Sequence, residues 1–223
     1  MFHTVGTGPG DRTTLMLVIE LVTTDGLFRL DGGEWEVTNN IWLVGDDREV
    51  IVIDAAHDAA PIIAAVHGRR VPAIALTHGH NDHINAAGAL QEAVDAPILL
   101  HPDDRMLWSH VYDDREPDAE LEDGAVLRAG SADLGVLHTP GHSPGGCCFV
   151  LESGGHVFSG DTLFCGGPGA TGRSFSDFST IIASIRARLL TLPPETVVHT
   201  GHGDTTTIGR EAPDLAEWLR RGH

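Results

Sequence analysis

A dense group of metal-binding side-chain types follows one apolar run of this chain. The run at 71–77 has the length and composition of a buried strand, and it leads directly into His78, His80, Asp82 and His83. In extended backbone, side chains two positions apart share a side, so His78 and His80 can point together, while Asp82 and His83 would open the next helix. If the group had no function, Asp82 would only cap that helix and the imidazoles would be solvated. Because so dense a group is hard to attribute to chance, we expect a metal site at this strand end.

Three further residues of ligand type each follow an apolar run. His142 lies in HTPGHSPGG, Asp161 in FSGDTLF and His202 in HTGHGD. The ends of strands are where open α/β sheets build their sites. Taken singly, each of these residues is more typical of a turn or a strand end than of a ligand. Together with the first four they make the set of about seven protein ligands that two divalent ions need, so we expect two ions per chain.

The apolar runs and the turn residues between them predict an α/β fold with a single domain over residues 1–223. Strands are expected at 14–22, 37–44, 49–54, 71–77, 97–101, 124–129, 133–139, 146–152, 156–160 and 195–200. Helices are expected at 58–67, 84–94, 178–191 and 211–221. Strands and helices alternate in the first half, whereas short runs typical of antiparallel strands dominate the middle. We therefore expect two sheets inside and helices outside.

Charge and cysteine content exclude several kinds of partner. Thirty-two acidic residues oppose fourteen basic ones, all of them Arg, and the formal charge is −18. Such a chain repels phosphate backbones and anionic lipids, so we expect no nucleic acid and no membrane as partners. No apolar stretch approaches the roughly 18 residues that a membrane helix requires. The N-terminal MFHTVGTGPGDR lacks the basic and apolar regions of a secretory signal. Cys147, Cys148 and Cys165 are too few for a disulfide framework, and we expect them in the core of a cytoplasmic protein.

The order of the motifs resembles the metallo-β-lactamase fold, and within it the hydrolases similar to glyoxalase II. The likeness runs from about Asn40 to Ile208 and rests on strand-ending Asp54, followed by THGHNDH, TPGHSPG, SGDTLF and TGHG. It implies a four-layer αββα sandwich, two mixed β-sheets flanked by helices, with a dinuclear metal site at one edge. Carried over position by position, it assigns one metal to His78, His80 and His142, the other to Asp82, His83 and His202, and the bridging position to Asp161. Asp54 matches the family's buried aspartate behind the ligands.

The resemblance also implies a chemistry. Two divalent ions, Zn²⁺ being favoured and Fe or Mn also acceptable to these ligands, would lower the pKa of a bridging water to about 7 and polarise a carbonyl. A thiolate leaves without a strong general acid, whereas an amide nitrogen needs a proton donor, so a small-molecule thioester suits the site. Asp82, beside the nucleophile, could orient the hydroxide or shuttle its proton, and Asp161 would hold both ions.

The chain departs from glyoxalase II in the part that binds substrate. That family has a C-terminal helical domain with cationic and tyrosine contacts to glutathione, whereas this chain has no Lys and one Tyr, Tyr112. It resembles instead the short, single-domain relatives, and we expect a carrier thiol other than glutathione, such as uncharged mycothiol. Arg173 is a candidate contact for a substrate carboxylate, its alternative being a plain surface arginine.

Two other activities of the same fold stay open. Persulfide dioxygenases use a single iron, held by the residues that correspond to His78, His142 and Asp161. Lactonases share the whole ligand set, and nothing in the sequence excludes a lactone as substrate. The sequence also leaves the oligomeric state open.

Overall fold

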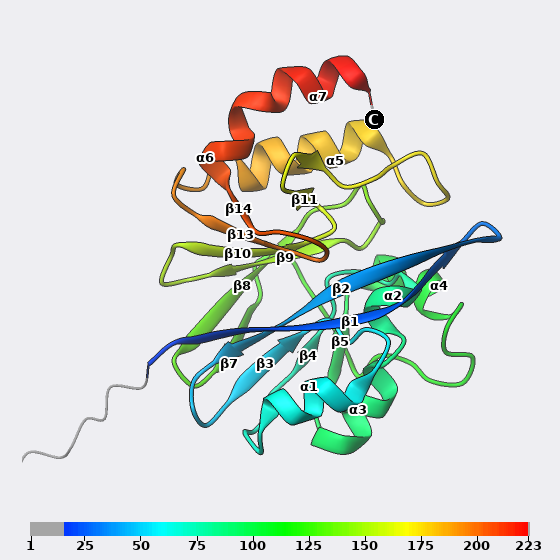
Figure 1. Ribbon diagram of the computed structural model, residues 1–223, viewed down its shortest axis with the longest axis vertical. Coiled ribbons are helices and arrows are strands. Elements are labelled where there is room, and N and C mark those ends of the chain that lie inside the picture. Colours follow the sequence, from blue (N-terminus) through cyan, green and yellow to red (C-terminus); the bar gives the residue numbers. More distant parts are fainter. Residues whose placement is uncertain (1–15, 223) are drawn as a thin grey trace, which may run out of the picture.

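Two six-stranded β-sheets form the centre of the structure, a computed structural model that describes residues 16–222 (Figure 1). The first sheet consists, in spatial order, of β1 (Val18–Leu30), β2 (Gly33–Gly45), β3 (Val50–Ile53), β4 (Ile74–Ala75), β5 (Ile98–Leu100) and β6 (Ala119–Glu120). The second consists of β14 (Thr206–Thr207), β13 (Val197–Thr200), β10 (His156–Gly160), β9 (Cys147–Leu151), β8 (Ala132–His138) and β7 (Val126–Ala129). A small hairpin of β11 (Leu163–Phe164) and β12 (Gly167–Pro168) follows β10.

Both sheets are mixed. In the first, β3 to β6 pair in parallel while β1, β2 and β3 pair antiparallel, and in the second only β10 and β13 pair in parallel. The helices of the described chain are α1 (Ala59–Val66), α2 (Asn81–Ile84), α3 (Ala87–Val94), α4 (Arg105–Trp108), α5 (Phe178–Ser184), α6 (Ile208–Glu211) and α7 (Leu215–Arg221).

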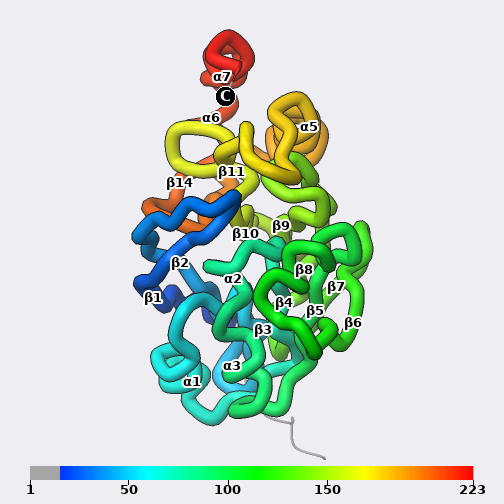
Figure 2. The backbone as a smooth tube through the Cα atoms, turned by 90° about the vertical axis from the view of Figure 1, so that its right-hand side faces the viewer, coloured from blue at the N-terminus to red at the C-terminus, as the bar shows by residue number. Residues whose placement is uncertain are grey.

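Three clusters of buried apolar side chains separate four layers. One cluster lies between the first sheet and α1 and α3, for example through Ile62, Ile74 and Leu90. A second fills the space between the sheets, and the third packs the second sheet against α5 and α7, where Trp218 is buried. Figures 1 and 2 show α1 and α3 at one end of this stack and α5 and α7 at the other. The αββα sandwich expected from the resemblance is therefore confirmed.

Local sequence explains the first of the packing helices. Asp58 caps the N-terminus of α1 by accepting a hydrogen bond from the Ala60 N–H at 2.9 Å. Ala59, Ile62 and Val66 then recur at helical spacing and are buried against the first sheet. The helix ends at His67, whose left-handed backbone stops it.

The hairpin of β1 and β2 is longer than the expected strands at 14–22 and 37–44. The first two positions of the former range lie outside the described residues, and β1 continues to Leu30 before turning. The two-residue turn Asp31-Gly32 has positive φ angles of 53° and 77°, which matches the twist of an extended hairpin. The tip of this hairpin therefore reaches out toward α2 and α4 (Figure 1).

Four other expected elements differ in extent. The helix expected at 178–191 is α-helical only over Phe178–Ser184 and continues as a π-helix over Ile185–Leu189. The run at 71–77 pairs only at Ile74–Ala75, because the chain then leaves the sheet to form the site. The helix expected at 84–94 starts at Ala87, after the separate turn of α2. The helix expected at 211–221 is interrupted and resumes as α7.

Side-chain hydrogen bonds join the two sheets at one edge. The amide of Asn40, in β2, donates to the carbonyls of Thr200 (3.1 Å) and Gly203 (2.9 Å), and the indole of Trp42 donates to Thr200 O at 3.1 Å. The end of β13 and the loop that follows it are thus fixed against β2.

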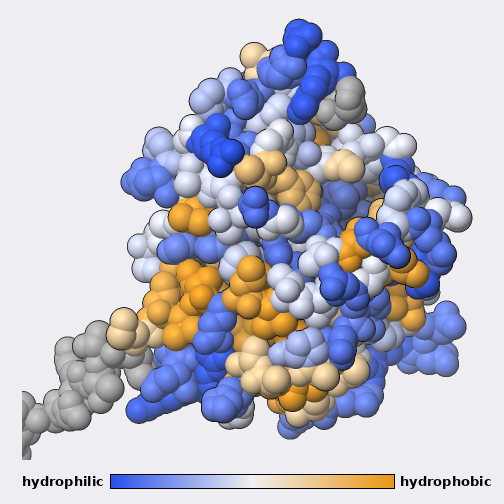
Figure 3. Space-filling model, in the orientation of Figure 1, coloured by the Kyte–Doolittle hydropathy of each residue, from blue (hydrophilic) through white to orange (hydrophobic). Residues whose placement is uncertain are grey.

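The outer surface is apolar in one region. Figure 3 shows hydrophobic side chains gathered over the start of β1, where Met16, Leu17 and Leu21 are exposed.

Among residues 16–222, no helix has the length and apolar character needed to cross a membrane.

Candidate metal centre

The first sheet supplies four of the seven predicted residues, from the segment after β4. Asp54, at the end of β3, accepts hydrogen bonds from the backbone N–H (2.7 Å) and the hydroxyl (2.9 Å) of Thr77, so it holds the segment where the strand pairing ends. The chain then passes into α2, whose first turn presents an acid and an imidazole. All four predicted side chains are buried: His78, His80, Asp82 and His83.

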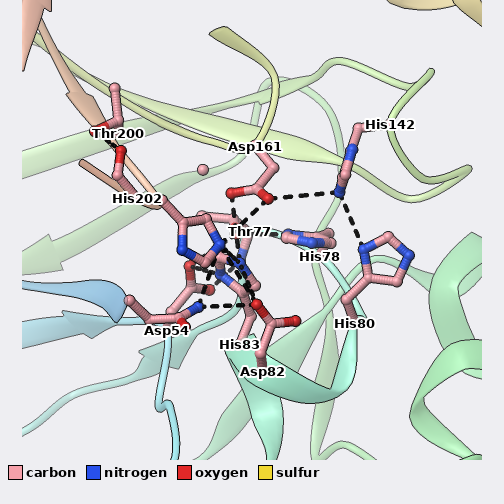
Figure 4. Close-up of polar contacts among 12 residues, drawn as sticks. Asp54, Thr77, His78, His80, Asp82, His83, His142, Asp161, Thr200 and His202 are labelled. Carbon is pink, nitrogen blue, oxygen red and sulfur yellow. Dashed lines mark hydrogen bonds and ion pairs between the residues drawn. The ribbon is translucent and has the colours of Figure 1, made fainter. Parts of the chain in front are cut away.

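The second sheet supplies the other three from loops that follow its strands. His142 lies in the loop after β8, Asp161 directly follows β10, and His202 lies just beyond β13. Glycine is required at position 201, because a Cβ there would collide with the Asp161 carboxylate and press on the His83 ring. Figure 4 shows these side chains converging from both sheets onto one spot.

The seven residues form two adjoining groups that share Asp161. The first group contains His78, His80 and His142, and its His80 Nδ1 and His142 Nε2 atoms lie 3.0 Å apart. Asp161 Oδ2 lies 3.6 Å from His142 Nε2. The His78 ring centroid is 4.8 Å from that of His80 and 4.9 Å from that of His142.

The second group contains Asp82, His83 and His202. The Nε2 atoms of the two imidazoles lie 3.1 Å apart, and Asp82 Oδ2 is 3.6 Å from the first and 3.4 Å from the second. Asp161 reaches the same imidazoles, with Oδ1 at 3.4 Å from His83 Nε2 and Oδ2 at 3.5 Å from His202 Nε2. Donor atoms that share one tetrahedral zinc ion stand about 3.3 Å apart, so these separations fit two ion positions bridged by Asp161.

Several donor atoms of the site have no hydrogen-bond partner although they are buried. Among the described residues, these include His78 Nε2, His80 Nε2, Asp82 Oδ1 and Asp161 Oδ1. An orphaned buried polar atom costs free energy, and native proteins keep such atoms where an ion or a water completes them. The residues present therefore suit a pair of divalent cations.

The two groups differ in their charge state. Burial lowers the pKa of His78 well below its ordinary value and that of His80 to about 3. Burial acts in the same direction in the second group, but the Asp161 carboxylate outweighs it, raising the pKa of His83 well above its ordinary value and that of His202 to about 10. His78 and His80 thus offer neutral imidazoles, whereas a cation entering the second group must displace protons.

Asp54 orients a ligand as well as the backbone. Its Oδ2 atom lies 2.8 Å from His83 Nδ1, and both side chains are almost fully buried. Once a cation has displaced the other proton of His83, this contact keeps the remaining proton on Nδ1 and leaves the Nε2 lone pair facing the other donors. The aspartate expected behind the ligands lies in that place.

Asn39 belongs to the site although the sequence did not single it out. Its side-chain amide donates to Asp82 Oδ2 at 3.2 Å, and its oxygen lies 2.8 Å from His57 Nε2. One oxygen of Asp82 is thereby fixed, and the other is one of the unpartnered atoms of the site. The residue stands in the long hairpin, so only the fold brings it here.

Asp104 is a second residue that sequence reasoning missed. It is fully buried, and it accepts hydrogen bonds from the backbone N–H groups of Gly79 (2.8 Å) and Gly145 (2.6 Å) and from the Ser143 hydroxyl (2.7 Å). These donors flank the imidazoles of the first group on two separate loops. Asp104 therefore sets the distance between His78 and His142.

Replacing Asp104 by asparagine is expected to weaken metal binding at the first group about 10- to 100-fold. The new amide turns two N–H bonds toward backbone donors and leaves one oxygen to accept. Zinc titration of the chelated protein checks this, with Asp47→Asn at an exposed position outside the donor groups as control. If the Asp104→Asn variant and the control bound zinc with the same affinity, whether that affinity was unchanged or reduced, the positioning role of Asp104 would be contradicted.

A cavity of about 290 Å³ opens in front of the site. Besides five of the seven ligand-type residues, it is lined by Phe28, Trp35, Val37, Phe164, Ala170 and Arg173. The Arg173 guanidinium lies 3.8 Å from the centre of the Trp35 ring and 5.9 Å from that of Phe28. The structure thus brings Arg173 to the cavity wall, where it stacks on aromatic rings of the hairpin.

One cysteine expectation is wrong. Cys147 and Cys148 are buried in β9 as expected, but Cys165 is exposed. It lies in the turn between β11 and β12, so its side chain is not needed to fill the core.

Comparison with known proteins places the chain in a family. The model of the metallo-β-lactamase superfamily matches residues 35–202. Hydroxyacylglutathione hydrolase GloC of Haemophilus influenzae is 32% identical over 186 residues, which are 77% of this chain and 87% of that protein. The crystal structure of TTHA1623 in a di-iron-bound form is 38% identical, with a TM-score of 0.71, and the match covers 79% of this chain and 93% of that one. ETHE1 from Myxococcus xanthus is 26% identical, with a TM-score of 0.67 over 87% and 85% of the two chains. The chain therefore belongs to the metallo-β-lactamase superfamily.

Proposed function

We propose that this protein is a dinuclear metallohydrolase that cleaves small-molecule thioesters. Members of the superfamily are mostly metal-dependent hydrolases, and the residues here suit divalent cations. The observation that carries the proposal is the pair of complete donor groups around Asp161, open to a cavity of ligand size. We propose Zn²⁺ as the cation, with Fe or Mn as the alternatives that imidazole and carboxylate donors also accept.

The side chains of the site would have different roles in binding the cations and in orienting the attacking water. Two bound divalent ions would lower the pKa of a shared water to about 7 and polarise the substrate carbonyl. The imidazoles and Asp161 hold the cations, while Asn39 pins Oδ2 of Asp82 and leaves Oδ1 free. That oxygen can orient the attacking water and take its proton.

The lining of the cavity favours a thioester over an amide. Among the described residues that line it, every carboxylate and imidazole belongs to the seven donors, and the remaining polar group is Arg173. No separate acid is therefore available to protonate a departing amine. A thiolate needs no such acid, because the pKa of a thiol is only about 8.5. The likeness to a protein named hydroxyacylglutathione hydrolase supports the same reaction class.

The dioxygenase alternative needs only His78, His142 and Asp161. In this chain the second group is equally complete and equally buried, and Asp54 and Asn39 orient two of its members. A single-iron enzyme would have no use for that arrangement. We therefore prefer the dinuclear hydrolase and keep the lactonase as the second candidate, because a lactone would use the same donors.

The test compares three substrates on protein loaded with zinc or iron. Release of free thiol from a neutral acyl thioester is expected with a kcat/KM of at least about 10⁴ M⁻¹s⁻¹, and a chelator should abolish it. Faster opening of a lactone would move the assignment to the lactonase. Oxygen uptake with a persulfide, without thioester cleavage, would contradict the proposal.

The compartment we propose is the cytoplasm. All three cysteines are unpaired, and one of them is exposed, which fits a reducing environment.

A further inference from the structure

A second and larger cavity adjoins the one in front of the donors. Its volume is about 580 Å³, and it lies between the tip of the β1–β2 hairpin and the segment around α2 and α4. His80 lines both cavities, so a ligand placed at the site can extend from one to the other past this imidazole. A thioester has two halves that meet at the reacting carbonyl, and the two cavities offer a place for each.

The larger cavity is charged, and its charge is negative. Its ionic lining residues are Arg29, Asp31 and Glu34 on the hairpin tip. The guanidinium of Arg29 pairs with Glu34, while Asp31 accepts a hydrogen bond from the Ser174 N–H at 3.1 Å. That hydrogen bond lowers the pKa of Asp31, so its carboxylate is ionised at neutral pH. One cation against two anions leaves a net charge of −1 on the lining.

The rest of the lining consists of apolar side chains, amides, glycines and the imidazoles of His80 and His110. Leu107, Val111 and Phe175 form the apolar part, and Asn81 and Asn85 add amide groups. Phe175 is 45% exposed and has a φ of 69°, a left-handed conformation that is unfavourable for a bulky residue. An exposed ring held in a strained backbone is typical of a surface kept for a ligand.

We propose that this larger cavity binds the carrier-thiol half of the substrate and selects carriers without net negative charge. The inference rests on the proposed thioester hydrolysis and goes beyond it by naming the class of carrier. The smaller cavity, with its aromatic wall and Arg173, takes the acyl half. A carrier that ends in carboxylates meets Asp31 and Glu34, and the guanidinium on this lining, that of Arg29, is already paired with Glu34. The formal charge of −18 on the whole chain acts in the same direction on approach.

Four acetyl thioesters that differ in the charge of the carrier provide the test. Acetylthiocholine is cationic, S-acetyl-N-acetylcysteamine is neutral, and the S-acetyl derivatives of N-acetylcysteine and glutathione are anionic. At low ionic strength, kcat/KM of the metal-loaded enzyme is expected to be about tenfold higher for the neutral carrier than for the anionic ones. The ratio should shrink in added salt, because screening weakens the repulsion.

A double substitution tests the residues. Asp31→Asn with Glu34→Gln changes the net charge of the lining from −1 to +1, and asparagine tolerates the positive φ of 53° at that turn. The variant is expected to prefer the anionic carriers. Its matched control, Asp47→Asn with Glu195→Gln, removes two exposed acidic charges elsewhere and should keep the wild-type order.

The outcomes separate the two proposals. Hydrolysis at equal rates for all four carriers, or a double variant that keeps the wild-type order, would overturn the carrier inference while leaving the thioester hydrolase in place. Failure to hydrolyse any of the four would overturn the proposed function and the carrier inference with it.

Discussion

Replacing Asp161 by asparagine is expected to lower kcat/KM by at least about a thousandfold and to leave fewer than two metal ions on each chain. The carboxylate approaches the Nε2 atoms of His83, His142 and His202 at 3.4 to 3.6 Å and therefore reaches imidazoles of both donor groups. An amide keeps a single oxygen and turns N–H bonds toward the imidazoles, so it cannot join two cations. Metal analysis after dialysis, together with thioester kinetics, checks the result.

The control for this variant is Asp47→Asn, an equal change of charge at an exposed position in the turn between β2 and β3. It should keep full activity and two ions. If Asp161→Asn also kept two ions and more than about a tenth of the activity, the carboxylate could not be the bridge.

Replacing Asp54 by asparagine is the second substitution with a large expected effect, although Asp54 touches no substrate cavity. Asparagine would present an N–H to His83 Nδ1 at the position where Oδ2 now lies, 2.8 Å away. The imidazole would then carry its proton on Nε2 and lose the lone pair that the second group needs. We expect a 10- to 100-fold loss of affinity for the second ion, with a matching loss of activity.

The hydrogen bonds from Thr77 to Asp54 add a stability effect. Leaving one of these buried donors unpaired costs about 1–3 kcal/mol, so the metal-free variant should also unfold at lower denaturant concentration. The pattern that identifies the mechanism is selective loss of the second ion in protein that is still folded at 25 °C. Equal affinity of both ions in Asp54→Asn and in Asp47→Asn would contradict it.

The donor residues could be predicted because their positions follow local rules. Each of the four motifs begins where a run of apolar residues ends, and the side chains needed for chemistry stand within a few positions of that point. The four-layer αββα arrangement was predicted from the same apolar runs and from the family resemblance. The structure brings all seven residues together, with Asp54 behind them.

What the sequence did not reveal depends on contacts between distant segments. Asn39 donates to Asp82, which lies 43 positions away, and Asp104 accepts from the backbone N–H of Gly79, which lies 25 positions away. Neither Asn39 nor Asp104 stands in a recognisable motif. The extended hairpin did carry a signal, the Asp31-Gly32 pair between alternating apolar residues, which predicts a two-residue turn. That signal predicts the pairing of Phe28 with Trp35 across the hairpin, whereas the position of the hairpin beside the site depends on the fold.

The exposure of Cys165 and the break between α2 and α3 have the same origin. Residue type predicted that Cys165 would be buried, but it lies in the turn that follows the segment around Asp161. Helical spacing predicted one helix over 84–94, but the segment that follows His80 forms the separate helix α2 first. At the β11–β12 turn and at the boundary between α2 and α3, the placement of the metal-binding side chains therefore outweighs local secondary-structure propensity.

We expect each chain to hold two cations between its two sheets. Elemental analysis of protein purified without added metal measures this, with the Asp161→Asn variant beside the wild type. The wild-type protein should contain about two divalent ions per chain, as zinc or as a mixture with iron, and the variant should contain fewer. One iron per chain, with Asp82, His83 and His202 dispensable for its binding, would rule out the dinuclear site and favour the single-iron dioxygenase.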